Sequence, residues 1–298
     1  MAIGLLLAST LSFALMDGLT KILSHTLPIP QILWVRSLVF SALMLGLLTA
    51  RGLPLRALIH SHRPSLQLAR ALLLVVEGGM FMLAFTLMPL ADVHAIAALS
   101  PLAVVALSVP LLGEKVGWRR WMAVLAGFAG VLLIVRPGFA KVEPAALIAL
   151  FAATLWAFYQ IMVRMCARTD SSDTTSLWTA VVGMLATSLV GPAAWLWPSG
   201  SEWALLAAIA LLGSIAHMAL IHALSLTQPS VLQPYSYTMF VWAVVVGYLL
   251  FGAVPNAWTW AGATIIIASG IYAWNRERIS QAGAVRAAAA GPTPIAAE

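Results

Sequence analysis

Long apolar runs separated by short polar connections are the feature that most limits what this chain can fold into. The ten runs lie near residues 2–24, 29–50, 68–88, 90–110, 118–136, 144–166, 174–196, 203–226, 230–251 and 257–275. Each is close to the roughly 20 residues that a helix needs to cross a bilayer, and they do not alternate as barrel strands would. Because 62% of the 298 residues are hydrophobic and 9% are charged, a soluble core could not bury the apolar surface. We therefore predict an all-α integral membrane protein with ten transmembrane helices.

The placement of the basic residues indicates how these spans are oriented. If the first residue lies in the cytoplasm, the connections and tail on that side, with the adjoining Arg70, hold twelve of the sixteen Lys and Arg residues. The connections on the opposite side hold Arg136 and Lys141. Because cytoplasmic loops carry the excess of positive charge, we predict that both termini are cytoplasmic. The formal charge of +6 is spread over span ends, which argues against a nucleic-acid partner.

The second half of the chain repeats features of the first. The stretch LLGEKVGWRRW returns as LFGAVPNAWTW, so a shift of 139 residues places Gly113 on Gly252. Two copies of five spans have an odd count each, so the second must insert upside down relative to the first, as in many secondary transporters. We predict inverted five-helix repeats at residues 1–139 and 140–275, followed by a disordered cytoplasmic tail at 276–298.

Three short motifs stand in the first half of the chain: MDGLTK at 16–21, WVR at 34–36 and LLGE at 111–114. Together with the span pattern they resemble the EamA branch of the drug/metabolite transporter (DMT) superfamily. The second copy departs from the pattern at Ala253, where the first has Glu114. The resemblance implies a ten-helix basket around a central cavity, alternating access and a bacterial inner membrane. It does not settle the substrate, because members carry amino acids, nucleotide-related metabolites, vitamins, quaternary amines or drugs.

Three charged residues lie within the first two spans, where a charge costs roughly 2.5–3.5 kcal/mol on insertion scales. Asp17 and Lys21 are four residues apart and therefore share a helix face on which they can pair. Arg36 enters the second span at a similar outer depth. Two interpretations stay open: a charged network that orients a substrate carboxylate or gates the outer mouth, or a structural ion network whose long cations reach the interface.

Glu77 lies in the middle of the third span, within LLLVVEGGMFML. The shift of 139 residues maps it beside His217 in the eighth span. We predict that the acid and the imidazole face each other near the midplane, where they can exchange a proton or bind a substrate amine. The alternative is a protonated Glu77 hydrogen-bonded in a helix contact, which Gly78 and Gly79 would allow by close approach.

Polar side chains also recur in the fourth and ninth spans. The same shift maps His94 onto Gln233, which stands four residues before Tyr237 and so shares its helix face. Pro101 and Pro234 predict breaks in these two helices that would turn backbone carbonyls toward a cavity. These polar residues are candidates for substrate binding, with aromatic walls from Trp156, Tyr159 and Trp242. For any single aromatic residue, packing is the commoner role.

The sequence carries no sign of catalysis or of a bound cofactor. Cys166 is the single cysteine, which excludes a disulfide framework or a cysteine-ligated zinc site within one chain. No HExxH, P-loop or GxSxG pattern occurs, and these are the common motifs of metalloproteases, nucleotide-binding enzymes and hydrolases. We predict no catalytic residues, no metal and no cofactor.

The expected function is secondary transport of a small amphipathic organic metabolite by alternating access, with amino acids as the first class and protons as a candidate coupling ion. Two alternatives stay open: an importer of a vitamin, nucleoside-like or quaternary-amine solute, and a membrane enzyme that acts on a lipid-linked substrate. The expected partners are the solute and membrane lipid, with the chain as a monomer or weak dimer.

Overall fold

The computed structural model describes residues 1–53, 58–113, 117–135, 144–227 and 229–289, with side chains for all of these except 120, 229–231 and 276–289. Within these ranges every regular element is a helix. Seven helical stretches are long and apolar enough to cross a membrane, and α7 contributes a shorter apolar one. The described part of the chain thus agrees with the predicted all-α membrane protein.

The helices follow the ten apolar runs in order. They are α1 (Ala2–Leu23), α2 (Ile29–Ala50), α4 (Pro64–Leu87), α5 (Leu90–Ala97), α6 (Ser100–Leu112), α7 (Trp118–Val135), α8 (Pro144–Cys166), α9 (Ser172–Ser188), the 3-10 turn η1 (Pro192–Ala194), α10 (Gly200–Leu226), α11 (Pro229–Ser236), α12 (Thr238–Phe251) and α13 (Ala257–Ala289). The seventh run ends earlier than predicted. After α9, a β-carbon at Gly191 would collide with the side chain of Trp34, and Pro192 then begins η1.

The fourth and ninth runs are each broken into two helices, as their prolines predict. The first break separates α5 from α6 just before Pro101, which occupies the first turn of α6, where a missing backbone N–H is tolerated. The second break falls at Tyr237, three residues after Pro234 in α11. The second helix of each run, α6 and α12, ends on a glycine in the left-handed conformation, Gly113 with φ 71° and Gly252 with φ 64°.

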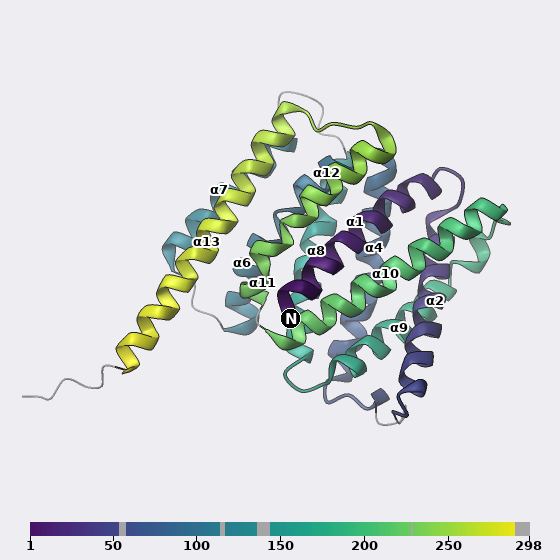
Figure 1. Cartoon of the computed structure of the whole chain (residues 1–298), viewed down its shortest axis with the longest axis horizontal. Coiled ribbons are helices and arrows are strands. Elements are labelled where there is room, and N and C mark those ends of the chain that lie inside the picture. The colour runs from purple at the N-terminus through teal and green to yellow at the C-terminus, as the bar shows by residue number, and fades with distance from the viewer. Residues whose placement is uncertain (54–57, 114–116, 136–143, 228, 290–298) are drawn as a thin grey trace, which may run out of the picture.

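Helices from the two halves of the chain pack against one another throughout. The main pairs are α1 with α10, α4 with α8, α2 with α9 and α7 with α13. Figure 1 shows α7 and α13 together at one edge of the molecule and α2 with α9 at the other. The α7–α13 contact is close because a β-carbon on Gly130 would stand 2.8 Å from the carbonyl oxygen of Gly262.

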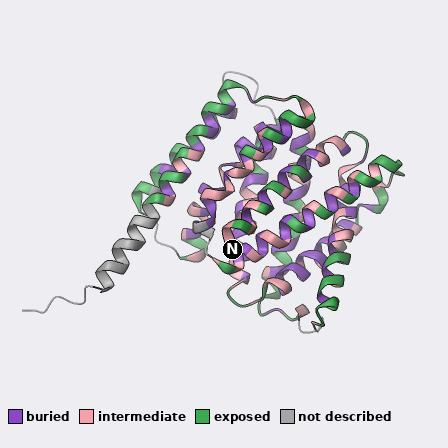
Figure 2. Ribbon diagram, viewed as in Figure 1, coloured by how far each residue is buried: buried purple, intermediate pink, exposed green. Residues whose placement is uncertain are grey.

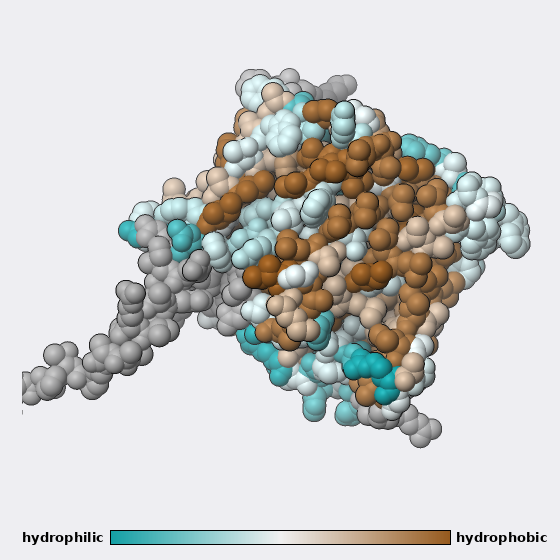
Figure 3. Space-filling view, in the orientation of Figure 1, coloured by the Kyte–Doolittle hydropathy of each residue, from teal (hydrophilic) through white to brown (hydrophobic). Residues whose placement is uncertain are grey.

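Each helix has a buried face and an exposed face that run along its length (Figure 2). Exposed faces are apolar: Leu185 of α9 is 59% exposed and Leu125 of α7 is 60% exposed. Hydrophobic side chains spread over α1, α10 and α12 in Figure 3, while hydrophilic ones gather at the lower edge. A helix surface of this kind suits lipid, because its backbone groups are already paired within the helix.

The end of the chain differs from the expected disordered tail. The backbone of α13 continues as helix to Ala289, and the alanine-rich sequence of this stretch has high helix propensity. Residues 290–298 lie outside the described residues.

Candidate functional site

A cavity lies at the centre of the helices and, with open solvent included, has about 980 Å³ of empty space. Its walls come from both halves of the chain: α1, α2, α4, α5 and α6 on one side, and α8, α10, α11 and α12 on the other. Six aromatic rings line it, namely Phe13, Phe81, Phe85, Trp156, Tyr237 and Phe240.

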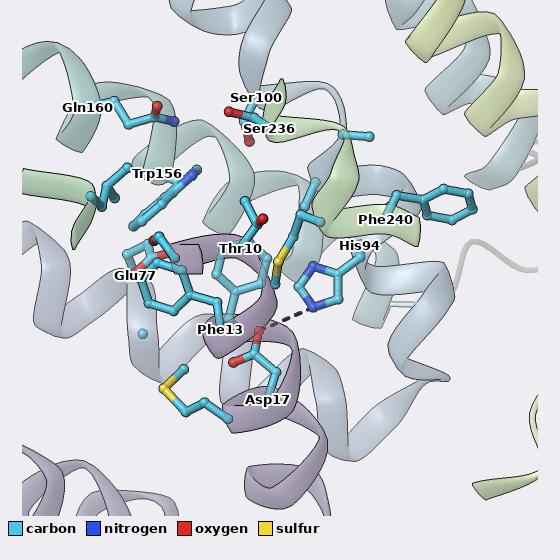
Figure 4. Close-up of a pocket in the computed structure, with 18 of the residues that line it drawn as sticks. Thr10, Phe13, Asp17, Glu77, His94, Ser100, Trp156, Gln160, Ser236 and Phe240 are labelled. Carbon is cyan, nitrogen blue, oxygen red and sulfur yellow. Dashed lines mark ion pairs between the residues drawn. The ribbon is translucent and has the colours of Figure 1, made fainter. Parts of the chain in front are cut away.

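Asp17 and His94 lie within salt-bridge distance of each other in the wall of this cavity. The carboxylate oxygen Oδ2 of Asp17 on α1 is 3.2 Å from Nε2 of His94 on the short helix α5, and Figure 4 shows the two side chains pointing at each other. The break between α5 and α6 leaves His94 in the last turn of α5, beside the ring of Phe85. The predicted pairing of Asp17 with Lys21 is therefore wrong.

Lys21 instead holds the end of α4. Its Nζ donates hydrogen bonds to the carbonyl oxygens of Phe85 at 2.6 Å and Met88 at 2.7 Å. Carbonyls in the last turn of a helix lack intrahelical partners and attract cations. Lys21 thus joins α1 to α4 and does not line the cavity, whereas Asp17 and Arg36 do.

Glu77 and Arg36 enter the cavity from neighbouring helices. Glu77 projects from the middle of α4, and Arg36 of α2 lies close enough to interact electrostatically with both Glu77 and Asp17. The guanidinium of Arg36 has one hydrogen-bond acceptor among the described residues, the sulfur of Met16 at 3.7 Å. Sulfur is a weak acceptor, so most of the donors of Arg36 remain available.

His217 reaches the same cavity from α10, as predicted, but it does not pair with Glu77. Its Nδ1 is 3.0 Å from the carbonyl oxygen of Gly213, and its ring stands edge-on to Phe13 at 4.8 Å between centroids. Its Nε2 is buried without a hydrogen-bond partner among the described residues. The ion pairs of those residues do not include Glu77 with His217, because the bond within its own helix turns the imidazole toward Phe13.

Gln233 and Tyr237 also line the cavity. The amide nitrogen of Gln233 donates to Oε1 of Gln160 at 3.2 Å, whereas its Oε1 and the hydroxyl of Tyr237 have no partner within the described chain. Tyr237 lies against Gly270, where a β-carbon would collide with its ring. Sequence reasoning missed Gln160; its position four residues after Trp156 in an apolar run was the available signal.

The three aromatic residues predicted to form walls of the cavity have different positions in the structure. Trp156 lines the cavity and stacks on Tyr159 with ring centroids 5.3 Å apart. Tyr159 is fully buried behind it, and Trp242 packs against the hydrophobic core. Neither Tyr159 nor Trp242 is among the residues that line the cavity.

Tyr159 belongs to a polar network around Arg70, which the sequence placed among the cytoplasmic basic residues. Arg70 is instead completely buried in α4. Its donors reach Oε1 of Gln67 at 2.9 and 3.2 Å, the hydroxyl of Thr179 at 2.9 Å and the carbonyl oxygen of Thr175 at 2.9 Å. The guanidinium also stands 5.5 Å from the centre of the Tyr159 ring. Full hydrogen bonding allows this charge to be buried.

The network continues to the connection between α8 and α9. Gln67 donates to Oδ2 of Asp170 at 2.9 Å, Ser61 donates to the same oxygen, and the backbone N–H of His62 donates to Oδ1 at 3.0 Å. Partial burial of Asp170 opposes ionisation, but these hydrogen bonds outweigh it and lower the pKa of the carboxyl below its ordinary value. Among the described residues, no group of three His, Cys, Asp or Glu side chains could hold a metal ion.

Comparisons with known proteins give consistent results over nearly the whole chain. The profile of the EamA-like transporter family matches residues 1–136 and again residues 143–274. The S-adenosylmethionine uptake transporter of Rickettsia felis is 26% identical over 270 residues, which cover 91% of each chain. The riboflavin transporter of Vibrio cholerae is 27% identical over 266 residues, or 89% of each chain.

Two further similarities extend this result. The pseudopaline exporter of Pseudomonas aeruginosa is 28% identical over 268 residues, which cover 89% of this chain and 93% of the exporter. One solved crystal structure matches with a TM-score of 0.60 at 22% identity and covers 89% of this chain and 96% of that chain. The structural likeness concerns the fold alone.

Proposed function

Because the chain belongs to the EamA-like transporter family, we propose that it is a secondary transporter that carries a small amphipathic organic metabolite by alternating access. The observation that carries the proposal is the central cavity, which is built from both halves of the chain and contains charged groups among aromatic walls. Charged residues at membrane depth are costly and mark solute or ion pathways in membrane proteins. The curated relatives are named as transporters.

The alternating-access mechanism draws support from the positions of the helices in the two halves. A shift of 139 residues maps the end of α4 at Leu87 onto the end of α10 at Leu226. It also maps α5 onto α11 and the start of α7 onto the start of α13. The main contacts exchange in the same way, since α1 packs on α10 as α4 packs on α8. We propose that residues 1–139 and 140–275 are inverted repeats that rock around the cavity.

The substrate class can be narrowed from the cavity and the relatives. The lining combines two carboxylates, one guanidinium, two imidazoles and six aromatic rings, which suits a solute with an aromatic or apolar body and charged groups. The relatives named for S-adenosylmethionine, riboflavin and pseudopaline favour a metabolite larger than the free amino acids expected from the sequence. Among the charged groups, Glu77 is the proposed site of proton coupling.

The proposed location is a bacterial inner membrane with both termini in the cytoplasm. Bacterial relatives and apolar helices support the membrane, and the distribution of Lys and Arg supports the orientation, because positive charge concentrates in cytoplasmic loops.

Binding and flux with the purified chain test this proposal. A thermal-shift screen of amino acids, vitamins, nucleosides, S-adenosylmethionine and amines is expected to yield a solute that raises the melting temperature, because a ligand stabilises by RT ln(1 + [L]/Kd). That solute should then accumulate in proteoliposomes that contain the protein and not in empty liposomes. Binding without flux for every stabilising solute would contradict a carrier.

A matched pair of variants ties flux to the cavity. Trp156→Phe alters an aromatic ring in the wall, whereas Trp242→Phe makes the same change at a tryptophan outside the lining. We expect the first variant to weaken solute binding and the second to leave it unchanged. Equal effects would mean that the solute binds elsewhere.

A further inference from the structure

A second, smaller cavity lies between α2, α4, α9 and α10 and, with open solvent included, has about 490 Å³ of empty space. Its walls are mainly apolar, from residues such as Leu33, Phe40 and Leu74, with hydroxyl groups from Ser37, Thr187 and Ser214. Arg36 and His217 line this cavity as well as the central one. The two cavities therefore meet at these two side chains.

Arg36 fits at this junction because glycines face it on both sides. A β-carbon on Gly213 of α10 would stand 3.3 Å from Cδ of Arg36 and 2.8 Å from the sulfur of Met16. A β-carbon on Gly78 of α4 would stand 3.0 Å from Nη2 of Arg36. The side chain thus lies between α4 and α10 in the wall that the cavities share.

The junction offers hydrogen-bonding atoms that the described protein leaves without good partners. A guanidinium carries five N–H donors, and those of Arg36 have the sulfur of Met16 as their acceptor. His217 places Nδ1 against a carbonyl oxygen, so the neutral ring carries its proton there and Nε2 is an acceptor. Nε2 is buried without a partner. A ligand could satisfy both residues if it placed an anionic group against the guanidinium of Arg36 and a neighbouring hydroxyl or N–H donor against Nε2 of His217.

The two cavities differ in charge. Asp17 and Glu77 line the central cavity, whereas the second cavity has Arg36 and His217 as its ionisable side chains. A cationic part of a solute is therefore favoured in the central cavity and disfavoured in the second, because like charges repel at close range.

We propose that the second cavity is a side subsite of the transport site. It receives an uncharged arm, apolar with hydroxyl groups, of a solute whose anionic group is held by Arg36. The cationic body of that solute, with any aromatic part, lies in the central cavity. This proposal rests on the proposed transport function. It narrows the expected solute to an elongated zwitterion rather than a simple cation.

Thiol labelling tests the subsite with small charged reagents in place of the solute. The native Cys166 is replaced by Ala, and Thr187→Cys then places a thiol in the second cavity, outside the central one. The probes are sulfonatoethyl methanethiosulfonate, which is anionic with a short arm, and its trimethylammonium counterpart. The labelling rate of each reagent at Thr187→Cys is divided by its rate at Thr169→Cys, a reference position that is exposed on the α8–α9 connection.

After this normalisation, we expect the anionic reagent to label Thr187→Cys roughly ten times faster than the cationic reagent does, because a buried cation concentrates anions. Arg36→Gln should remove this preference. Gly183→Leu should block labelling, since Gly183 faces the same cavity, whereas Gly46→Leu on the exposed face of α2 should not. Gly183→Ala is the milder variant: its β-carbon would meet Ser37 Oγ at 3.8 Å, and labelling should slow only in part.

An unlabelled thiol at 187, a preference for the cationic reagent, or labelling that ignores Gly183→Leu would each overturn the subsite. Failure of the transport proposal looks different, because it appears as absent flux in proteoliposomes whatever the labelling rates are.

Discussion

Two arginines lie deep among the helices, and the protein holds them in opposite ways. Arg70 of α4 is fully buried, and its donors reach oxygens of neighbouring side chains and of one backbone carbonyl. Arg36 of α2 has one sulfur acceptor among the described residues and borders two cavities. A buried charge therefore does not by itself indicate function. The state of its hydrogen bonds distinguishes a structural arginine from one that can bind a ligand.

The largest expected effect is on stability, at Arg70. Arg70→Met removes the cation but leaves Gln67 and Thr179 buried without their partner, so we expect the free energy of unfolding to fall by about 3 kcal/mol. Unfolding of the purified protein by SDS, followed by tryptophan fluorescence, measures it. Arg164→Met is the control, because Arg164 is only partly buried, with one bond to a carbonyl at 3.4 Å. Equal losses in the two variants would remove the distinction between the arginines.

The next effect is on transport, at Arg36. Arg36→Gln is expected to lower flux of the transported solute at least about tenfold, or about 1.4 kcal/mol, while costing less stability than Arg70→Met. Arg36→Lys keeps the charge but loses the planar fork of donors and should recover only part of the flux. A variant that unfolds as readily as Arg70→Met, with normal transport in its folded fraction, would make Arg36 a structural residue.

A smaller change in rate is expected at Glu77, the carboxylate within electrostatic reach of Arg36. Glu77→Gln should lower flux a few-fold and flatten its dependence on pH, because an amide cannot carry a proton through the cycle. Glu202→Gln makes the same change at a partly exposed carboxylate at the start of α10, outside the cavity, and should leave the pH profile intact. Wild-type flux with an unchanged pH profile in Glu77→Gln would rule out proton coupling through this residue.

The smallest effect is expected at the outer end of the Arg70 network. Asp170 has a lowered pKa in the folded protein, so it stabilises the fold above its unfolded pKa, and this stability is lost as the pH falls through the folded value. Because Asp170 is partly exposed, we expect a contribution of under about 1 kcal/mol. Asp170→Asn should remove this dependence in unfolding experiments from neutral to acidic pH. If Asp170→Asn loses as much stability at acidic pH as the wild type does, other carboxylates account for that loss.

The helices were largely predictable because each apolar run carries its own signal. Hydrophobic length placed α1 and α2 almost to the residue, and prolines located the breaks in the fourth and ninth runs. The end of α9 was missed although the sequence carries a signal for it, because Gly191 followed by Pro192 is typical of a turn. The contact of Gly191 with Trp34 of another helix is visible only in the fold.

The cavity was predictable in its members but not in their partners. The rule that charges are rare in apolar spans found Asp17, Glu77, His94 and His217, and all four line the cavity. The pairing of Asp17 with His94 joins residues far apart in the chain, so helix packing decides it rather than the spacing of Asp17 and Lys21. Whether these residues bind the solute stays a prediction.

The burial of Arg70 was not predicted, for a related reason. Its position near a basic connection resembles a topology signal, and its partners come from α8 and α9 as well as its own helix. The spacing of Gln67 and Arg70 at one turn of helix was the local hint, since such residues can interact.

The contact between α7 and α13 bears on how the protein is made. α7 enters the membrane early, but the partner of its Gly130 face is the last helix of the chain. Roughly 120 residues separate the two helices, which at about 5–20 residues per second takes roughly 6–24 s to synthesise. During this interval the small-residue face of α7 meets lipid, an insertion factor or the α7 of another nascent chain. The α7–α13 contact therefore forms only after α13 has been synthesised and inserted.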